Sequence, residues 1–550
     1  MNHKKYKRFE TVNYYDRTWP NKRIEKAPIW VSVDLRDGNQ ALINPMTIYE
    51  KVEFFKCLCA IGFKQIEIGF PSSSQIEFDF LRKLVDDDLI PTDVTIQVLT
   101  QAREHLIKRT FEALKGVKKA IVHIYNSTSA LQRKVVFQKT KEEIKNIAIE
   151  GVSLVKKLAK NFKGELILEY SPESFTGTEM DFVLEIIDEI VDVWDSKDKL
   201  ILNLPATVEM DTPNIYADQI EYISKKIKKR HLVILSTHPH NDRGCAVASA
   251  ELALLAGAER VEGTLFGNGE RTGNVDIITL ALNLLTHGID PKLDFTNIDE
   301  IKNLYKKVTK MNIGDRDPYV GALVFTAFSG SHQDAINKGM KYREINDSKY
   351  WEVPYLPIDP ADLKREYEPI IRINSQSGKG GVAFILEKEY GFILPKELQA
   401  EFSKEVKLSS EKGGELSSKY IYDLFISKYV NIHNPLTYIQ YNHYNEQRKE
   451  ISFDIKYKDK ISNCIGKGNG RISAVVNALA SMLNQDFNIV EYSEHSLTQG
   501  ADSVAASYVQ VTNNIETTYG VGVNNDTLIA AIEAVVSGVN RILVRRSKNE

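Results

Sequence analysis

From residue 29 onwards, short runs of β-branched and apolar residues alternate with longer amphipathic segments. The longer segments, such as IYEKVEFFKCLCAIG, carry apolar residues three and four positions apart, which predicts helices that bury one face. The short runs predict strands: IWVSVD (29–34), QIEIGF (65–70), VTIQVLT (94–100), AIVHIYN (120–126), ELILEYS (165–171), LILNLPA (200–206), LVILSTH (232–238) and RVEGTLF (260–266). Eight strand–helix units in about 260 residues predict an α/β fold, a closed (β/α)8 TIM barrel.

A doubly wound open sheet is the alternative fold. Such a sheet typically carries a Gly-rich dinucleotide-binding turn after its first strand. No G-x-G-x-x-G follows residues 29–34. The barrel is therefore favoured.

The alternation of strands and helices stops after about residue 310, so a chain of this length is expected to contain further domains. Pro-rich turns such as VPYLPIDP among helical pieces predict small linker subdomains. Beyond them, four strand-like runs (ISFDIKYK, FNIVEYSEHS, SYVQVTNN, TTYGVGVN) and two helical runs predict a C-terminal α+β domain. The predicted divisions are an N-terminal extension (1–28), the barrel (29–310), linker subdomains (311–430) and a C-terminal domain (431–550).

Composition excludes several classes of protein. Lys and Arg number 71 against 74 Asp and Glu, a net charge of -3, so the chain offers no polycationic nucleic-acid surface. Four scattered cysteines do not form a disulfide framework. No uninterrupted apolar run approaches the roughly 20 residues that span a bilayer, and the basic start lacks an apolar signal segment. We expect a cytoplasmic protein.

Polar residues gather where the predicted strands end. In a barrel, the loops after the strands form one concave face that carries the chemistry. The residues at these positions are Arg36, Asp37, Leu99, His123, Ser171, Glu173, Asn203, Thr207, His238, His240, Asn241, Asp242, Glu270, Arg271 and Asn274. This distribution predicts a functional site at the carboxyl ends of the strands.

Four of these residues predict a metal site. His238 and His240 are two apart on an extended segment, so their imidazoles point the same way. Asp37 and Asn274 come from neighbouring parts of a closed barrel, and this ligand set suits Mg²⁺, Mn²⁺ or Zn²⁺. Such an ion would polarise the carbonyl of a 2-oxo acid, and Arg36 would stabilise the negative charge that develops on oxygen. The alternative for Arg36 and Asp37 is an ordinary ion pair that ends a strand.

Three motifs, D-L-R-D-G-N-Q, H-P-H-N-D and G-N-G-E-R-T-G-N, closely resemble the α-isopropylmalate synthase family of Claisen-condensing (β/α)8 metalloenzymes. The likeness continues through YNSTSALQRKVVF, EYSPESFTGTE, FTAFSGSHQDAINKG and VPYLPIDPADL to RINSQSGKGGVAFIL, so it covers nearly the whole chain. R-D-G and H-x-H are shared with homocitrate and citramalate synthases and with lyases. SGSHQDAINKG and YLPIDP are more specific to the isopropylmalate branch.

The resemblance implies a reaction and a division of roles. The reaction transfers acetyl from acetyl-CoA to 3-methyl-2-oxobutanoate and gives 2-isopropylmalate and CoA, the committed step toward leucine. The implied metal ligands are Asp37, His238 and His240, with Asn274 in the same role or just outside it. The implied keto-acid contacts are Arg36, His123, Ser171 and Thr207, and the implied walls around the isopropyl group are Leu99, Asn203 and Pro205. Glu173, His332 and Tyr355 are implied to handle protons or activate water.

Several of these residues have simpler explanations. His123 also suits a hydrogen-bonded core histidine, and Glu173 suits the N-cap of a helix. His332 and Tyr355 lie outside the barrel, where a surface histidine and a packing tyrosine are ordinary. If these two act in catalysis, they must reach the barrel mouth, which points to a homodimer in which the partner subunit supplies them.

The acyl-CoA site and the regulatory site are less readable. Backbone around Gly267, Gly269 and Gly273 would let a thioester approach closely, although a plain turn is equally consistent. SGKGG (377–381) lacks the spacing of a phosphate loop and indicates a hairpin or a domain joint.

In the C-terminal domain, GKGNGR and YSEHSLTQGADSVAASYVQV resemble the leucine-sensing domain of these synthases. Small residues there would leave a pocket for an aliphatic amino acid: Gly500, Ala501, Ala505 and Ala506. The alternative is a dimerisation domain without a ligand. For the whole chain, the competing functions are condensation on 2-oxoglutarate or pyruvate, the reverse lyase reaction, and a non-catalytic sensor.

Overall fold

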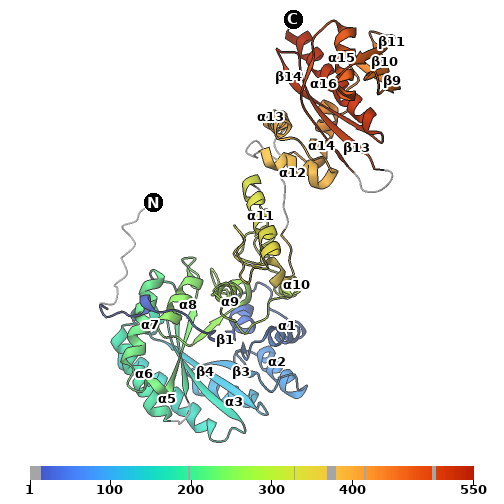
Figure 1. Cartoon of the computed structure of the whole chain (residues 1–550). Coiled ribbons are helices and arrows are strands. Elements are labelled where there is room, and N and C mark those ends of the chain that lie inside the picture. Colours follow the sequence, from blue (N-terminus) through green and yellow to red (C-terminus); the bar gives the residue numbers. More distant parts are fainter. Residues whose placement is uncertain are drawn as a thin grey trace. The chain divides into compact units, whose positions relative to one another are not determined.

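The computed structural model describes residues 14–195, 199–327, 329–367, 379–413, 416–497 and 503–549 (Figure 1). The chain divides into two compact units. The first comprises Met1–Val324 with Ile358–Glu366, and the second comprises Phe325–Pro357 with Tyr367–Glu550.

The first unit is a closed barrel of eight parallel strands, which confirms the predicted fold. The strands are β1 (Ile29–Ser32), β2 (Gln65–Gly69), β3 (Thr95–Gln101), β4 (Lys119–Ser127), β5 (Glu165–Glu173), β6 (Leu200–Ala206), β7 (Val233–Pro239) and β8 (Arg260–Gly263). Pairing of Val31 with Glu262 and of Ser32 with Gly263 joins β1 to β8 and closes the barrel.

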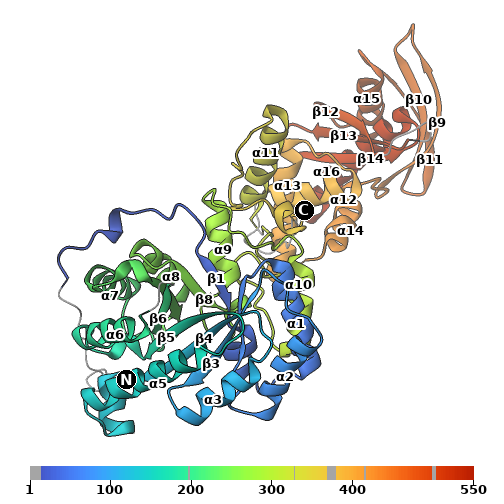
Figure 2. The same cartoon turned by 90° about the horizontal axis from the view of Figure 1, so that it is seen from below.

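Helices surround the barrel (Figure 2). They are α1 (Ile48–Ile61), α2 (Gln75–Asp86), α3 (Glu104–Ala113), α4 (Ala130–Gln132), α5 (Lys141–Ala159), α6 (Met180–Trp194), α7 (Pro213–Lys226), α8 (Ala246–Leu255), α9 (Ile277–Thr286) and α10 (Ile298–Thr309). Their starts follow from local sequence: Thr47 accepts a hydrogen bond from the Glu50 N–H, and the Glu50 carboxylate accepts one from the Thr47 N–H. A Thr-x-x-Glu sequence thereby begins α1, and Thr140 with Glu143 begins α5 in the same way.

The chain leaves β1 through a tight π-helical turn, η3 (Asp34–Gly38). The N–H groups of Arg36, Asp37 and Gly38 all point to the carbonyl of Val33, at 3.2, 2.9 and 3.1 Å. Asp34 is buried and accepts from the N–H of Leu265, which ties this turn to the loop after β8. The turn therefore sets the position of the arginine and carboxylate that follow the first strand.

The second unit begins with helices and ends in an α+β domain, as predicted. The helices are α11 (Gly330–Asn346), α12 (Lys379–Tyr390), α13 (Lys396–Gly413) and α14 (Ser418–Tyr429). The C-terminal elements are β9 (Leu436–Asn445), β10 (Glu450–Tyr457), β11 (Lys460–Lys467), α15 (Arg471–Leu483), β12 (Asn488–Ser496), β13 (Ala505–Thr512), β14 (Thr517–Asn524) and α16 (Thr527–Asn549). The prediction missed β9 and β11, whose polar residues weaken the apolar pattern. Residues 377–378, 500 and 501, which the sequence singled out, lie outside the described residues.

The C-terminal domain repeats one unit of three antiparallel strands and a helix. Its two sheets have the orders β11-β10-β9 and β12-β13-β14. A side chain at Gly466 would overlap Ala474 and Ala478 on α15, and one at Gly522 would overlap Ala530 and Ala534 on α16. The spacing from glycine to helix is the same in both, so each helix lies directly against a glycine of the strand before it.

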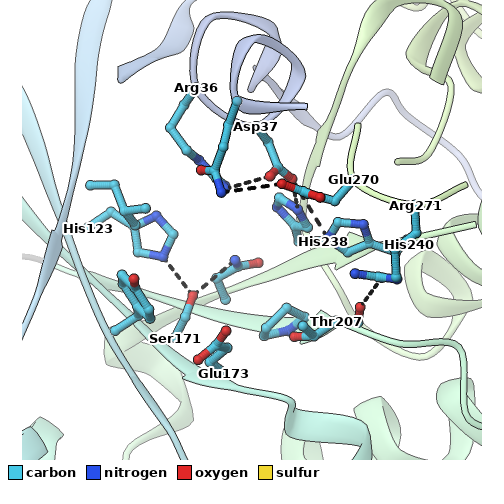
Figure 3. Close-up of a pocket in the computed structure, with 15 residues that line it drawn as sticks. Arg36, Asp37, His123, Ser171, Glu173, Thr207, His238, His240, Glu270 and Arg271 are labelled. Atoms are coloured by element: carbon cyan, nitrogen blue, oxygen red, sulfur yellow. Dashed lines mark hydrogen bonds and ion pairs between the residues drawn. The ribbon is translucent and has the colours of Figure 1, made fainter. Parts of the chain in front are cut away.

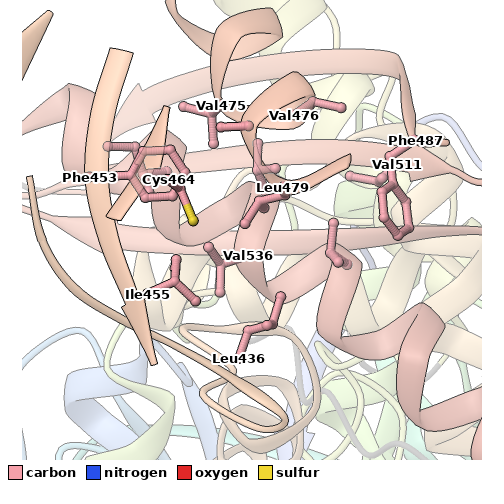
Figure 4. Packing of buried hydrophobic residues seen from close by; sticks show 14 of the residues in the cluster. Leu436, Phe453, Ile455, Cys464, Val475, Val476, Leu479, Phe487, Val511 and Val536 are labelled. Carbon is pink, nitrogen blue, oxygen red and sulfur yellow. The ribbon is translucent and has the colours of Figure 1, made fainter. Parts of the chain in front are cut away.

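Both sheets and both helices share one apolar core (Figure 4). Phe453 on β10, Leu479 on α15, Val511 on β13 and Val536 on α16 are all fully buried in it. Thr527–Arg545 of α16 is long and apolar enough to cross a membrane, but 67% of its apolar window is buried inside the protein. It is a core helix of this domain.

Candidate active site

A cavity of about 230 Å³ lies at the carboxyl ends of the barrel strands (Figure 3). Its lining comprises Arg36, Asp37, Gln40, Leu99, His123, Tyr125, Ser171, Glu173, Asn203, Pro205, Thr207, His238, His240, Glu270 and Arg271. The structure thus brings together the barrel residues singled out for the keto acid and its wall, and three of the four singled out for the metal. Gln40 and Tyr125 also line the cavity, although the sequence had not singled out either residue.

One wall of the cavity carries a candidate metal site. Ligand atoms of Asp37, His238 and His240 all lie within 4.8 Å of one another. Asp37 Oδ2 is 3.2 Å from His238 Nε2 and 3.7 Å from His240 Nε2. Asn274 donates its Nδ2 to the same oxygen at 2.8 Å. Among the described residues, His240 Nδ1 and Asn274 Oδ1 are buried without a hydrogen-bond partner. Converging ligand atoms and unsatisfied polar atoms fit a bound divalent cation.

The loop after β8 is folded around Asn274. Asn274 pairs with His240 in an isolated bridge. A side chain at Gly269 would overlap the Asn274 carboxamide, and Gly273 adopts φ +94°, a conformation that favours glycine. These two glycines are therefore required to place Asn274, which gives them a structural reason independent of any thioester.

Burial and neighbouring charges shift the pKa values of three side chains in this wall. Burial alone would raise the pKa of Asp37, but Arg36 and His238 hold that pKa well below its usual value. Burial lowers the pKa of His238, but its hydrogen bonds to Asp37 and Glu262 outweigh this effect and raise it to about 9. Burial and the neighbouring His238 lower the pKa of His240 to about 4. Asp37 is thus ionised and His240 is neutral, as ligands to a cation must be, whereas His238 has to release a proton before it can bind one.

Arg36 and Asp37 do form an ion pair after β1, but Arg36 also pairs with Glu67 at the cavity wall. Its Nε donates to Glu67 Oε2 at 2.6 Å, and its Nη1 lies 2.9 Å from Asp37 Oδ1. The side chain is 13% exposed, so the guanidinium is held between two carboxylates at the cavity wall. It keeps donors for a negatively charged ligand.

His123 is fixed by bonds on both ring nitrogens. Nδ1 lies 2.8 Å from Glu67 Oε1, and Nε2 lies 2.7 Å from Ser171 Oγ. Asn203 donates its Nδ2 to the same Ser171 oxygen at 3.1 Å. His123 is therefore a buried, hydrogen-bonded histidine that also lines the cavity. Its hydrogen bonds within the protein do not prevent it from contacting a substrate.

Glu173 ends β5 and does not cap a helix. Its carboxylate accepts a hydrogen bond from Ser127, and it lines the cavity. Arg271 also lines the cavity, where it pairs with Asp242 and donates to the carbonyl of Thr207. The proton-handling candidate on the barrel is thereby placed at the cavity.

Below the cavity lies a layer of buried polar side chains that the pattern of strand ends does not predict. Glu67, Gln97, Glu169, Arg260 and Glu262 are all 0% exposed. The carboxylates of Glu169 and Glu262, with His123, form a second cluster of possible ligand atoms. Arg260 lies 3.1 Å from Glu169 and 2.7 Å from Glu262. Its guanidinium already balances the charge of these carboxylates, so we do not assign a metal to this cluster.

His332 and Tyr355 belong to the second unit. Their rings stack with centroids 3.9 Å apart and an interplanar angle of 20°. His332 is exposed on α11, and Tyr355 is 61% exposed. Their arrangement leaves both side chains accessible for contacts outside their own unit.

A second, larger cavity of about 1060 Å³ adjoins the first. The two share Arg36, Gln40, Leu99 and Tyr125 in their linings. Apart from these, the large cavity is lined mainly by residues of α1, α2 and the loops before them, including Met46, Tyr49, Phe70 and Ile76, and by the last residues of β2 and β3. A small polar chamber thus opens onto a larger and more apolar one.

The sequence matches three protein-family models. Residues 27–305 match "HMGL-like", residues 322–387 match "Alpha-isopropylmalate synthase, post-catalytic domain-like", and residues 415–543 match "LeuA allosteric (dimerisation) domain".

Full-length relatives carry one common name. The chain is 55% identical over 540 residues to a 2-isopropylmalate synthase of Helicobacter hepaticus, covering 96% of this chain and 97% of the relative. It is 53% identical to that of Clostridium acetobutylicum, covering 98% and 99%, and 52% identical to that of Agrobacterium fabrum, covering 99% of each.

Proposed function

The chain belongs to the 2-isopropylmalate synthase family, and we propose that its barrel condenses acetyl-CoA with 3-methyl-2-oxobutanoate. The products are (2S)-2-isopropylmalate and CoA, in the first committed step of leucine biosynthesis. The observation that carries this proposal is the clustering of Asp37, His238 and His240 within 4.8 Å at a cavity that also holds Arg36.

Asp37, His238, His240 and Asn274 would hold the divalent metal that the family implies. When bound, the metal supplies Lewis-acid polarisation of the keto oxygen. Mg²⁺ is the proposed ion, with Mn²⁺ and Zn²⁺ as alternatives for a site of two imidazoles and oxygen ligands.

The protein's own residues position the keto acid. Arg36 donates toward the oxygen that gains negative charge as the new carbon–carbon bond forms. His123, Ser171 and Thr207 hold the carboxylate end. Leu99, Asn203 and Pro205 form the wall for the isopropyl group.

The same wall argues against a dicarboxylate substrate. A second carboxylate, as in 2-oxoglutarate, needs a cationic partner of its own. Of the two arginines that line the cavity, Arg271 is paired with Asp242 and Arg36 is assigned to the keto oxygen, so neither is left for a second carboxylate. Leu99 offers an apolar surface instead.

We place acetyl-CoA in the larger cavity, with its thioester at the residues that the two cavities share. A base removes a proton from the acetyl methyl group, and the resulting enolate carbon bonds to the keto carbon, whose oxygen takes the electron pair and then a proton. Water hydrolyses the thioester and releases CoA. Glu173, His332 and Tyr355 are the proposed proton-handling groups.

The partner subunit of a homodimer would supply His332 and Tyr355. The match of residues 415–543 to an allosteric dimerisation domain supports a dimer with a regulatory domain. We propose leucine as the inhibitor bound there, and we retain the predicted division into a catalytic barrel (29–310), linkers (311–430) and a regulatory domain (431–550).

The test is CoA release from acetyl-CoA with 3-methyl-2-oxobutanoate, pyruvate or 2-oxoglutarate, with and without a chelator. We expect chelator-sensitive release that prefers 3-methyl-2-oxobutanoate and is lost in His240→Ala. Preference for another keto acid would contradict the proposed wall. Release that a chelator leaves unchanged would contradict the metal site.

A further inference from the structure

Six side chains, three that line the cavity and three buried behind them, form a closed ring of hydrogen bonds and ion pairs. They come from β2, β3, β7, β8 and the turn after β1: Glu67, Gln97, His238, Glu262, Arg36 and Asp37. The ring joins the candidate metal site to the arginine and histidine that face the keto acid.

One half of the ring runs through Gln97. Its Nε2 donates to Glu67 Oε1 at 3.2 Å and to Glu262 Oε1 at 3.0 Å, so one amide bridges two buried carboxylates. Glu67 in turn accepts from Arg36 at 2.6 Å and lies 2.8 Å from His123 Nδ1. Gln97 therefore supports both groups through Glu67.

The other half runs through Glu262. His238 Nδ1 lies 2.7 Å from Glu262 Oε2, and His238 Nε2 faces Asp37 Oδ2 at 3.2 Å. Asp37 Oδ1 lies 2.9 Å from Arg36, which closes the ring. A carboxylate on Nδ1 keeps a proton on that nitrogen and aims Nε2 at the candidate metal position.

Glu262 has no capacity left for a ligand of its own. Oε2 accepts from His238 and, at 3.1 Å, from Asn203. Oε1 accepts from Gln97 and, at 2.7 Å, from Arg260. Four donors occupy the roughly four lone-pair directions of a carboxylate, so Glu262 acts only through the residues that it holds.

We propose that Glu262 and Gln97 are positioning residues that couple metal binding to keto-acid binding. This inference rests on the proposed function for the identity of the keto acid. Neither side chain lines the cavity, and both are fully buried. Changing either one therefore alters the site only by moving or reorienting its neighbours.

The first test replaces Glu262 by the nearly isosteric glutamine. The Glu262→Gln amide cannot accept from all four donors, so His238 loses its fixed orientation. We expect the dissociation constant for Mn²⁺, measured by direct titration of the protein without substrates, to rise roughly 10- to 100-fold. The KM for acetyl-CoA should stay within about twofold.

The second test removes the bridging amide with Gln97→Met. We expect the KM for 3-methyl-2-oxobutanoate to rise roughly tenfold or more, because the carboxylates of Glu67 and Glu262 each lose a hydrogen-bond donor and Arg260 loses an acceptor. Mn²⁺ binding should weaken as well, since the ring is broken.

Ser236→Ala is the matched control. Ser236 is fully buried and bonds Arg260 at 2.9 Å, but it lies outside the ring. Its Mn²⁺ affinity and KM values should match those of the wild type, and thermal unfolding should show that all variants fold. If Glu262→Gln does not fold, the Mn²⁺ affinity and the KM of Gln97→Met test the inference on their own.

Unchanged Mn²⁺ affinity and KM in the folded ring variants would overturn the inference, as would an equal change in Ser236→Ala. The Mn²⁺ titration needs no turnover. Wild-type protein that binds Mn²⁺ but releases no CoA would therefore contradict the proposed function and leave the inference about Glu262 and Gln97 to the Mn²⁺ titration.

Discussion

The interior of the barrel below the site and the core of the C-terminal domain bury very different side chains. Below the site, Glu67, Glu169, Glu262 and Arg260 are removed completely from water. Between the two C-terminal sheets, the core cluster is made of side chains such as Phe453 and Val511. Apolar burial is the main favourable term in folding, whereas burying charges costs free energy that their pairing only partly offsets. The buried polar layer of the barrel therefore holds the side chains of the site in position, whereas the apolar C-terminal core stabilises its domain.

The largest expected effect on stability comes from the C-terminal core. Phe453→Ala leaves a cavity among residues that are fully buried, and we expect a loss of about 3–5 kcal/mol in the free energy of unfolding. Differential scanning calorimetry of the full chain should show one transition at lower temperature.

Ile461→Ala is the control for this change. Ile461 lies on the neighbouring strand but is 58% exposed. Its unfolding free energy should change by no more than about 0.5 kcal/mol. Equal losses in the two variants would show that burial does not determine stability in this sheet.

The next effect falls on catalysis and sharpens the contrast. Arg36→Lys keeps a positive charge between Asp37 and Glu67 but loses the planar fork that contacts both. We expect kcat to fall about 10²- to 10³-fold, the cost of losing one donor to a developing oxyanion. Steady-state CoA release measures this.

Arg230→Lys is the matched change at the other end of the barrel. Arg230 pairs with Glu259 just before β7, where strands begin. Turnover should remain at the wild-type level, because residues at this end support stability. A comparable fall in kcat would mean that the Arg36 effect is not specific to the cavity.

The smallest effect concerns substrate choice. Leu99 lines the cavity and is 7% exposed. Leu99→Ala removes part of the apolar wall and enlarges the space beside it. We therefore expect the ratio of kcat/KM values for two keto acids to shift about 10- to 200-fold toward the one with the longer aliphatic chain. Competition between 3-methyl-2-oxobutanoate and 4-methyl-2-oxopentanoate measures the shift.

Val98→Ala separates preference from packing. Val98 is adjacent on β3 and fully buried, but its side chain points to the opposite face of the strand. The variant should be less stable with an unchanged substrate ratio. A shifted ratio would place the specificity wall elsewhere.

The barrel was predictable from sequence because its strands are apolar and regularly spaced. The residues at strand ends were found for the same reason, since a polar residue after an apolar run is conspicuous. The buried layer was missed because Glu67, Gln97 and Glu262 stand inside strands and not at their ends. A signal was present: each is a polar residue within a run such as QIEIGF, where it has to face the barrel interior.

Other parts gave weaker signals. β9 and β11 contain Asn, Gln, His and Lys beside their apolar residues. Their apolar and polar residues therefore do not alternate clearly enough to be distinguished from a loop. The stacking of His332 on Tyr355 joins positions far apart in the linker region, and neither local sequence predicts it.

The repeated unit of the C-terminal domain bears on ancestry and on stoichiometry. Two copies of one three-strand and helix unit, each with a glycine set against its helix, make this domain an internal repeat within a single chain. Such a chain begins with two equivalent sites for any ligand that its repeat can bind. One effector molecule bound per chain would record divergence of the halves, as where Asn477 on α15 occupies the helix position of Glu533 on α16. Two molecules per chain would record that the ancestral equivalence has been kept.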